Sequence, residues 1–258
     1  MPFFVAVFTL LGLFVGSFLN VCIDRLPQRQ SIINPPSHCS ACNHKLGILD
    51  LVPLFSFLWL RGRCHYCQAR LPLRLPIIEG ITGFIFAFLY WKFGLGLELG
   101  ISFIYASLLI IIFVIDLENQ LVLDKVIYPS MVLALTFSFF WPELGVISAL
   151  GEGALSKVVS SLAGGALGLV TMALPFIIYR RGMGMGDIKL AALIGLMTGF
   201  PLVIVALLLA VITGGLVGAV LLAFKIKKRK DAIPFAPFLA TSAMVTLLWG
   251  QTIYRWYL

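Results

Sequence analysis

Long apolar runs separated by short polar segments dominate the chain. A helix needs about 20 residues to cross the hydrocarbon core of a bilayer, and most of the runs reach or approach that length. The run 188–224 is too long for one span, and Gly199-Phe200-Pro201 inside it predicts a break into two helices. The pattern predicts about eight transmembrane helices, within runs at roughly 2–22, 75–91, 99–115, 121–141, 155–179, 188–224 and 232–257.

The composition narrows the fold class. Charged residues make up 12% of the chain, against about 25% in an ordinary soluble domain. This excludes a soluble globular enzyme, a disordered chain and a disulfide scaffold. Only helices or closed barrels satisfy their backbone in lipid, and the runs are continuous rather than alternating, unlike barrel strands. We therefore expect an all-α polytopic membrane protein.

The basic residues set the expected topology. The net charge is +8, and most Lys and Arg lie in the first, third, fifth and seventh loops. The positive-inside rule places these loops in the cytosol and both termini outside, which explains the charge without nucleic acid. Residues 2–21 lack a preceding basic segment and a small-residue cleavage site, so we expect a retained first helix rather than a signal peptide.

Four cysteines lie in the first loop, over residues 25–74, as the pairs Cys39-Ser-Ala-Cys42 and Cys64-His-Tyr-Cys67. Two such pairs supply four thiolates, enough for a closed tetrahedral zinc site, and disulfides are disfavoured in the cytosol. The alternatives are metal-free reduced thiols or a thiol switch. The chain's histidines all flank these cysteines, and we expect supporting or surface roles for them rather than ligation.

Three aspartates lie at predicted membrane edges, where carboxylates are costly and suggest function. Asp116 ends an apolar run, Asp124 follows in the same loop, and Asp187 opens the next span after Gly182-Met-Gly184-Met-Gly186. Asp124 and Asp187 could each be a helix N-cap, and Asp116 could simply mark the water boundary. Two neighbouring carboxylates that share a proton could instead hydrolyse a peptide bond, and no Ser–His pair offers comparable chemistry.

The glycines before Asp187 are more than a cap requires. Glycine permits positive φ and close backbone approach, so we expect Gly184 and Gly186 to let a substrate backbone reach the carboxylate. Asp116 should lie near a helix C-terminus and Asp187 at a helix N-terminus. Helix dipoles then favour Asp187 as the ionised base and Asp116 as the protonated acid.

An ordered series of motifs resembles the bacterial type IV prepilin peptidases, which are bifunctional leader peptidases and N-methyltransferases of the GxGD aspartyl protease type. Besides the cysteine pairs, the matching segments are GSFLNVCIDRLP at 16–27, DLVPLFSFLWLRGRC at 50–64, LPIIEGITG at 75–83, IDLENQLVLD at 115–124, GMGMGDIKLAALIGLMTG at 182–199 and IPFAPFLA at 233–240. The chain departs from the usual pattern at CSAC and at Ala236, which replaces a glycine. We expect neither change to touch a catalytic group or a metal ligand.

The resemblance implies an enzyme of the bacterial inner membrane. Asp116 and Asp187 would be catalytic, and Cys39, Cys42, Cys64 and Cys67 would form the family's tetrad. The substrates would be prepilins and pseudopilins of type IV pilus or protein secretion systems, cut at the cytosolic face and N-methylated with S-adenosylmethionine. The expected parts are a first transmembrane helix over 1–24, a methyltransferase-associated zinc domain over 25–74 and a peptidase bundle over 75–258, surrounded by membrane lipids.

Two alternatives to the bifunctional enzyme stay open. One is a peptidase alone, with the zinc loop structural or used for substrate docking. The other is a transporter with a zinc loop, which would place charges near mid-bilayer. The sequence has no glycine-rich methyltransferase loop, so it assigns no residues to the cofactor site and gives no oligomeric state. Glu79 could bind a charged group, or could instead pair with Arg74 or Lys189.

Overall fold

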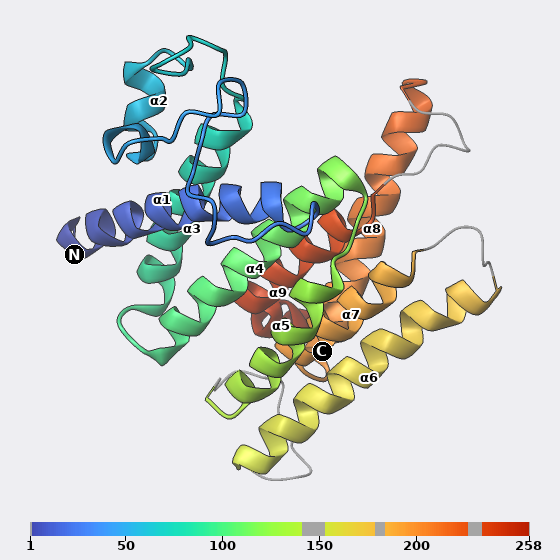
Figure 1. Ribbon diagram of the computed structural model, residues 1–258. Helices are drawn as coiled ribbons and strands as arrows, with labels where there is room; N and C mark the ends of the chain where they lie inside the picture. The colour runs from blue at the N-terminus through green and yellow to red at the C-terminus, as the bar shows by residue number, and fades with distance from the viewer. Residues whose placement is uncertain (1, 141–152, 179–183, 227–233, 258) are drawn as a thin grey trace. The chain divides into compact units, whose positions relative to one another are not determined.

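The computed structural model describes residues 2–140, 153–178, 184–226 and 234–257, and these ranges are helical, without β-strands (Figure 1). Gly182 and the basic residues 227–230 of the seventh loop, which the sequence analysis used, lie outside them. The elements are α1 (Pro2–Arg25), the 3-10 turn η1 (Leu49–Leu51), α2 (Phe55–Trp59), α3 (Arg74–Phe93), α4 (Leu97–Asn119), α5 (Asp124–Ser138), α6 (Ala154–Ile178), α7 (Met185–Thr198), α8 (Leu202–Ala223) and α9 (Ala236–Tyr257).

Each predicted span coincides with one helix, so the all-helical membrane fold is confirmed. In the described ranges, five helices are long and apolar enough to cross a membrane, namely α1, α3, α4, α6 and α8. The count of about eight spans stays a prediction, because α5 and α7 have only 15 and 14 residues and α9, with 22 residues, is not among these five helices. The break inside 188–224 is confirmed: α7 ends at Thr198, and Gly199 takes a φ of +71°.

The chain divides into two compact units, Met1–Ser107 and Leu108–Leu258. In the first, α1 and α3 pack as a close antiparallel pair. A Cβ built on Gly12 would lie 2.7 Å from Gly83 Cα, and one on Gly16 would lie 2.8 Å from Glu79 Cα. Glycine is therefore needed at both α1 positions, because any side chain would push the helices apart.

Polar and aromatic side chains complete this pair. Asn20 of α1 donates from Nδ2 to the Leu75 carbonyl at 3.1 Å, at the end of the pair that carries the 25–74 loop. Toward the other end, Phe103 of α4 stacks on Phe86 with ring centroids 4.1 Å apart and also contacts Phe8. The loop thus leaves and re-enters a closely packed pair of helices.

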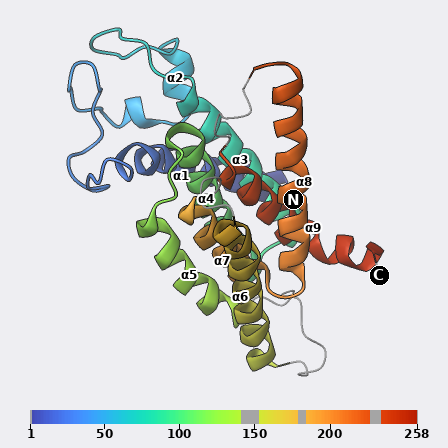
Figure 2. The same ribbon diagram turned by 90° about the vertical axis from the view of Figure 1, so that its right-hand side faces the viewer.

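The second unit is built around α7. Both views show α6 running alongside α7 (Figures 1 and 2), and close glycine contacts explain that packing. Gly164 and Gly168 of α6 face Gly195 and Ala191 of α7 so closely that a built Cβ would overlap the opposite backbone. The Ser161 hydroxyl also donates to the Leu196 carbonyl at 2.7 Å.

Helix α7 is the most enclosed element of this unit. Every residue from Leu190 to Thr198 is buried, and α5, α6, α8 and α9 all contact the helix. Its first turn carries Asp187. The position of that carboxylate is therefore set by four neighbouring helices.

Candidate active site and metal site

The two cysteine pairs sit in two turns of the same construction. In the first, Cys39 N–H donates to the His44 carbonyl, and Asn43 N–H donates back to the Cys39 carbonyl. In the second, Cys64 N–H donates to Ala69, and Gln68 N–H donates to Cys64. Asn43 and Gln68 both take positive φ, at +56° and +59°. The loop therefore contains two copies of one local turn, a repeat that the sequence analysis did not find.

The two turns bring the four cysteines together as predicted. The Sγ atoms of Cys39, Cys42, Cys64 and Cys67 all lie within 4.8 Å of one another. Backbone N–H groups of Ala41 and Cys42 lower the pKa of the Cys39 thiol to about 7, which favours the thiolate that binds metal. The donor set and spacing fit a tetrahedral metal site.

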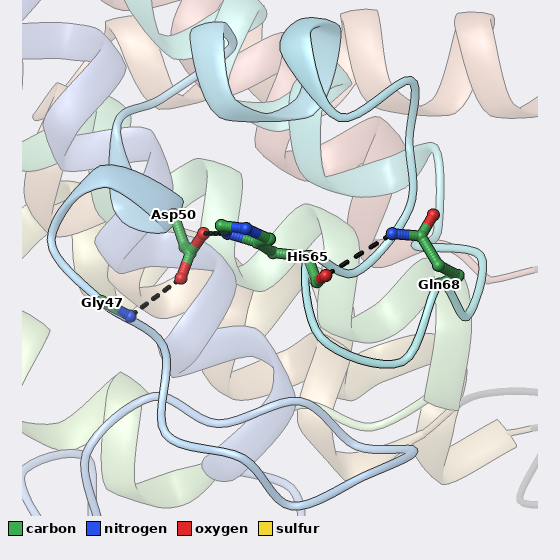
Figure 3. Close-up of polar contacts among 4 residues, drawn as sticks. All are labelled: Gly47, Asp50, His65 and Gln68. Carbon is green, nitrogen blue, oxygen red and sulfur yellow. Dashed lines mark hydrogen bonds and ion pairs between the residues drawn. The ribbon is translucent and has the colours of Figure 1, made fainter.

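A polar cluster of Gly47, Asp50, His65 and Gln68 joins the segment after the first turn to the second turn (Figure 3). Asp50 accepts a hydrogen bond from Gly47 N–H at 3.0 Å and contacts His65 Nδ1 at 3.3 Å. The Gln68 side-chain amide donates to the His65 carbonyl at 3.4 Å. His44 packs on Tyr66, with ring centroids 3.7 Å apart. His44 and His65 therefore support the loop and stand outside the cysteine cluster, as the sequence predicted.

The two candidate catalytic aspartates lie at helix ends in the second unit. Asp116 is in the last turn of α4, which ends where Gln120 takes a φ of +52° and donates to the Asp116 carbonyl at 2.9 Å. Asp187 is in the first turn of α7. The structure places the two carboxylates near enough for the negative charge of Asp116 to act on Asp187.

The Asp116 carboxylate is poorly satisfied for so buried a group. Its side chain is only 4% exposed. Within the described ranges, Oδ2 has no hydrogen-bond partner. Buried polar atoms are normally hydrogen-bonded, and the exceptions are often catalytic. A shared proton or a substrate group would complete this site.

Gly186 has a packing role that the sequence analysis did not predict, while the approach of a substrate backbone past Gly184 and Gly186 stays a prediction. A Cβ on Gly186 would lie 2.6 Å from Val122 Cβ, so Gly186 admits the segment 120–123 that follows Asp116. Gly184 has an extended backbone with φ −79°, and the nearest atom to its built Cβ is Asp187 Oδ2 at 3.7 Å. Neither glycine takes the positive φ that the sequence argument allowed. Gly186 instead holds the two aspartate-bearing segments together.

The N-cap interpretation of Asp124 is wrong. Asp124 is the first residue of α5, its predecessor Leu123 occupies the N-cap position, and no side chain caps the helix. The Asp124 carboxylate instead accepts a hydrogen bond from Lys189 Nζ at 2.6 Å. Lys189 also lies 5.3 Å from the Tyr128 ring centroid. Since Lys189 follows Asp187 by two residues, this ion pair ties the start of α5 to the start of α7.

Ala236 is a contact that the sequence analysis missed. Its backbone N–H, at the start of α9, donates a hydrogen bond to the Asp116 carboxylate. This contact is made by the backbone N–H, which glycine and alanine share, so the effect of the departure from the usual glycine stays untested. Asp187 likewise receives a backbone hydrogen bond, from Gly184. The predicted helix-end positions of both aspartates are confirmed, and the division into an ionised Asp187 and a protonated Asp116 stays a prediction. The sequence did contain a signal for this helix start, because the motif IPFAPFLA has a proline shortly before the first residues of the helix.

Glu79 has a structural partner. The Leu54 N–H donates to Glu79 Oε2 at 2.8 Å, and Ser17 of α1 also hydrogen-bonds this carboxylate. Of the two cations considered for Glu79, Arg74 contacts Asp24 at 2.6 Å and Lys189 contacts Asp124. Glu79 therefore anchors the residue that precedes α2.

Comparisons with known proteins agree with this arrangement. Residues 10–93 match the family profile described as bacterial peptidase A24 N-terminal domain, and residues 103–219 match the type IV leader peptidase family. No solved structure gives a significant match to the chain.

Named relatives match almost the whole chain. It is 31% identical to the prepilin leader peptidase/N-methyltransferase of Pseudomonas putida, over 98% of this chain and 93% of that protein. It is 32% identical to the proteins of the same name in Stutzerimonas stutzeri, over 99% and 94%, and Bacillus subtilis (strain 168), over 96% and 95%. Both family profiles and these full-length similarities show that the chain belongs to the type IV leader peptidase family.

Proposed function

We propose that the protein cleaves the leader from type IV prepilins or pseudopilins and methylates the new N-terminus. The observation that carries the peptidase assignment is a buried Asp116 oxygen that no described group satisfies, in a carboxylate whose negative charge acts on Asp187. The names of the relatives support both activities.

The carboxylate pair supplies the acid and base of peptide hydrolysis. One aspartate, ionised, accepts a proton from water while the water oxygen attacks the scissile carbonyl carbon. The other, protonated, then gives its proton to the leaving amine nitrogen as the C–N bond breaks. Since each carboxylate receives one backbone N–H, from Ala236 or Gly184, we treat the two as a unit that shares one proton rather than assigning fixed roles.

The cysteine cluster would hold one structural zinc ion. Four thiolates close the coordination sphere and leave no position for a substrate, so the ion would stabilise the 25–74 loop and take no part in hydrolysis. The loop, as the methyltransferase-associated part, and S-adenosylmethionine as methyl donor follow from the family. The relatives' names imply a methyl donor, but no described residue identifies its site.

The expected orientation rests on the distribution of basic residues. Lys and Arg concentrate in alternate loops, including the one that carries the cysteines. We therefore propose an inner-membrane protein with both termini extracytoplasmic and with the cysteine loop and both aspartates at the cytosolic face.

Mass spectrometry of a cleaved substrate tests the proposal. The purified protein in lipid is incubated with a prepilin, with and without S-adenosylmethionine. We expect a shortened pilin in both reactions, and a mass increase of one methyl group on its N-terminal residue only when the donor is present.

Each outcome separates one alternative. Cleavage without methylation would assign the peptidase alone and leave the cysteine loop a structural or docking role. An intact prepilin in both reactions, from protein whose cysteine metal content is full, would overturn the proposal.

A further inference from the structure

The stretch of the cysteine loop around α2 exposes an unusual amount of apolar surface. Ile48 and Leu49 are 88% and 82% exposed, and Leu58 and Trp59 are 73% and 77% exposed. The rings of Phe55 and Trp59 stack with centroids 5.9 Å apart, so these residues share one face of α2, with Leu58 beside them. A loop surrounded by water on all sides would not leave such a patch uncovered.

One contact ties this stretch to α3, and a second joins α1 to α3 at the end of the helix pair that carries the loop. Leu54, directly before α2, donates its N–H to Glu79, which lies five residues into α3 and therefore about 7.5 Å from the start of that helix. Arg74 at the start of α3 pairs with Asp24 at the end of α1 at 2.6 Å. The Leu54 hydrogen bond thus ties the start of α2 to α3.

The charge of the loop complements an anionic surface. Between residues 25 and 74, Asp50 is the sole acidic residue, and it is engaged with Gly47 and His65. Exposed basic side chains follow α2 directly, at Arg61 and Arg63, and recur at Arg70 and Lys45. Aromatic rings next to arginines are the composition that prefers the boundary between headgroups and acyl chains.

We propose that η1 and α2 form a membrane-seating surface, residues 48–59, that inserts into the interfacial region of the leaflet at the Arg25–Arg74 end of the α1/α3 pair. Phe55, Leu58 and Trp59 lie among the upper acyl chains, and Arg61 and Arg63 contact anionic headgroups. The cysteine cluster is thereby held against the bilayer instead of moving freely on a tether. This proposal is independent of the peptidase assignment.

Depth-dependent quenching tests the seating. Full-length protein that retains only Trp59, with Trp91, Trp141, Trp249 and Trp256 changed to Phe, is placed in nanodiscs whose acyl chains are brominated near the headgroup or near the chain end. We expect shallow bromine to quench Trp59 at least twofold more than deep bromine. Arg61→Gln with Arg63→Gln should reduce the quenching in anionic lipid and leave it unchanged in zwitterionic lipid.

A matched control uses another exposed tryptophan. A protein that retains only Trp91, 73% exposed in the last part of α3, reports lipid contact away from the loop and should be unaffected by the arginine changes. If the Trp59-only protein does not fold, as judged by its cysteine metal content, the fraction of quenched emission is compared between wild type and Trp59→Phe.

Two results would overturn the proposal. In the first, brominated lipid leaves the Trp59 emission unchanged, and aqueous iodide quenches that emission as strongly as it quenches free indole. The other is a Trp59 that becomes shielded only after a prepilin is added, which would make residues 48–59 a substrate-docking surface.

Discussion

The cysteine loop and the aspartate pair are both assembled from two sequence motifs, but different forces bring the motifs together. Each cysteine pair is shaped by backbone hydrogen bonds within its own turn, such as Cys39 N–H to His44 and Cys64 N–H to Ala69. No local turn of this kind contains both Asp116 and Asp187. They meet because Gly186 admits Val122 and because Lys189 pairs with Asp124.

The packing of the helices around the two sites also differs. The α1/α3 pair meets through Gly12 and Gly16, but 17% of the most apolar window of α1 is buried, so most of that helix faces outward. Helix α7 is buried throughout Leu190–Thr198 among four neighbours. The difference teaches that the cysteine cluster needs little from its surroundings, whereas the aspartate pair depends on the packing of the whole second unit.

The largest expected effect comes from the aspartates themselves. Asp116→Asn or Asp187→Asn should each lower prepilin cleavage on the order of a thousandfold, because either change removes the shared proton. The rate of leader removal measures this. Glu98→Gln, in the first turn of the same α4, is the matched control and should cleave normally. Full cleavage by the Asp187→Asn protein would end the assignment.

Substitution of the cysteines should affect the fold of the loop more than it affects cleavage. Cys39→Ser with Cys42→Ser should release the metal and unfold the 25–74 loop, because ligation supplies much of the folding free energy of so small a domain. Cleavage should persist in part, because both aspartates lie in the second unit. Metal analysis and protease sensitivity of the loop report the change. Wild-type protein without zinc and with freely reactive thiols would refute the zinc site.

A packing mutation tests whether the aspartate pair depends on remote contacts. Gly195→Val should lower the free energy of unfolding by about 1–3 kcal/mol and impair cleavage, because its side chain would overlap the Gly164 backbone of α6. Thermal unfolding and the cleavage rate measure the two effects. Gly215→Val in α8 is the control, since no described atom lies within 4 Å of a Cβ built there. Equal behaviour of the two variants would show that α7 tolerates displacement.

The smallest effect is expected at the ion pair between α5 and α7. Asp124→Asn should cost at most about 1 kcal/mol, because the Asp124 side chain is 56% exposed and solvent screens the pair. Cleavage should fall a fewfold, and added salt should lower the wild-type rate toward that of the variant. A loss as large as that of Asp116→Asn would instead place Asp124 in the chemistry.

The apolar runs were sufficient to predict the helices, and the cysteine spacing was sufficient to predict the cluster. Both are local properties: a run longer than a bilayer span forms a helix whatever its neighbours, and a CxxC turn closes on itself. The break at Gly199 followed from the same kind of reasoning, because a glycine and a proline interrupt the run there. Asp124 was assigned wrongly because a residue before a helix resembles an N-cap unless its distant partner, Lys189, is known.

The chain's own residues thus determined the fold class, the cysteine tetrad and the identity of the aspartates as candidates. Only the tertiary structure decided which groups surround those aspartates. Ala236 is 120 residues from Asp116 in the sequence, and its N–H reaches that carboxylate because α9 begins beside the end of α4. No periodicity or spacing in the sequence indicates such a contact, since it arises from how separate helices pack.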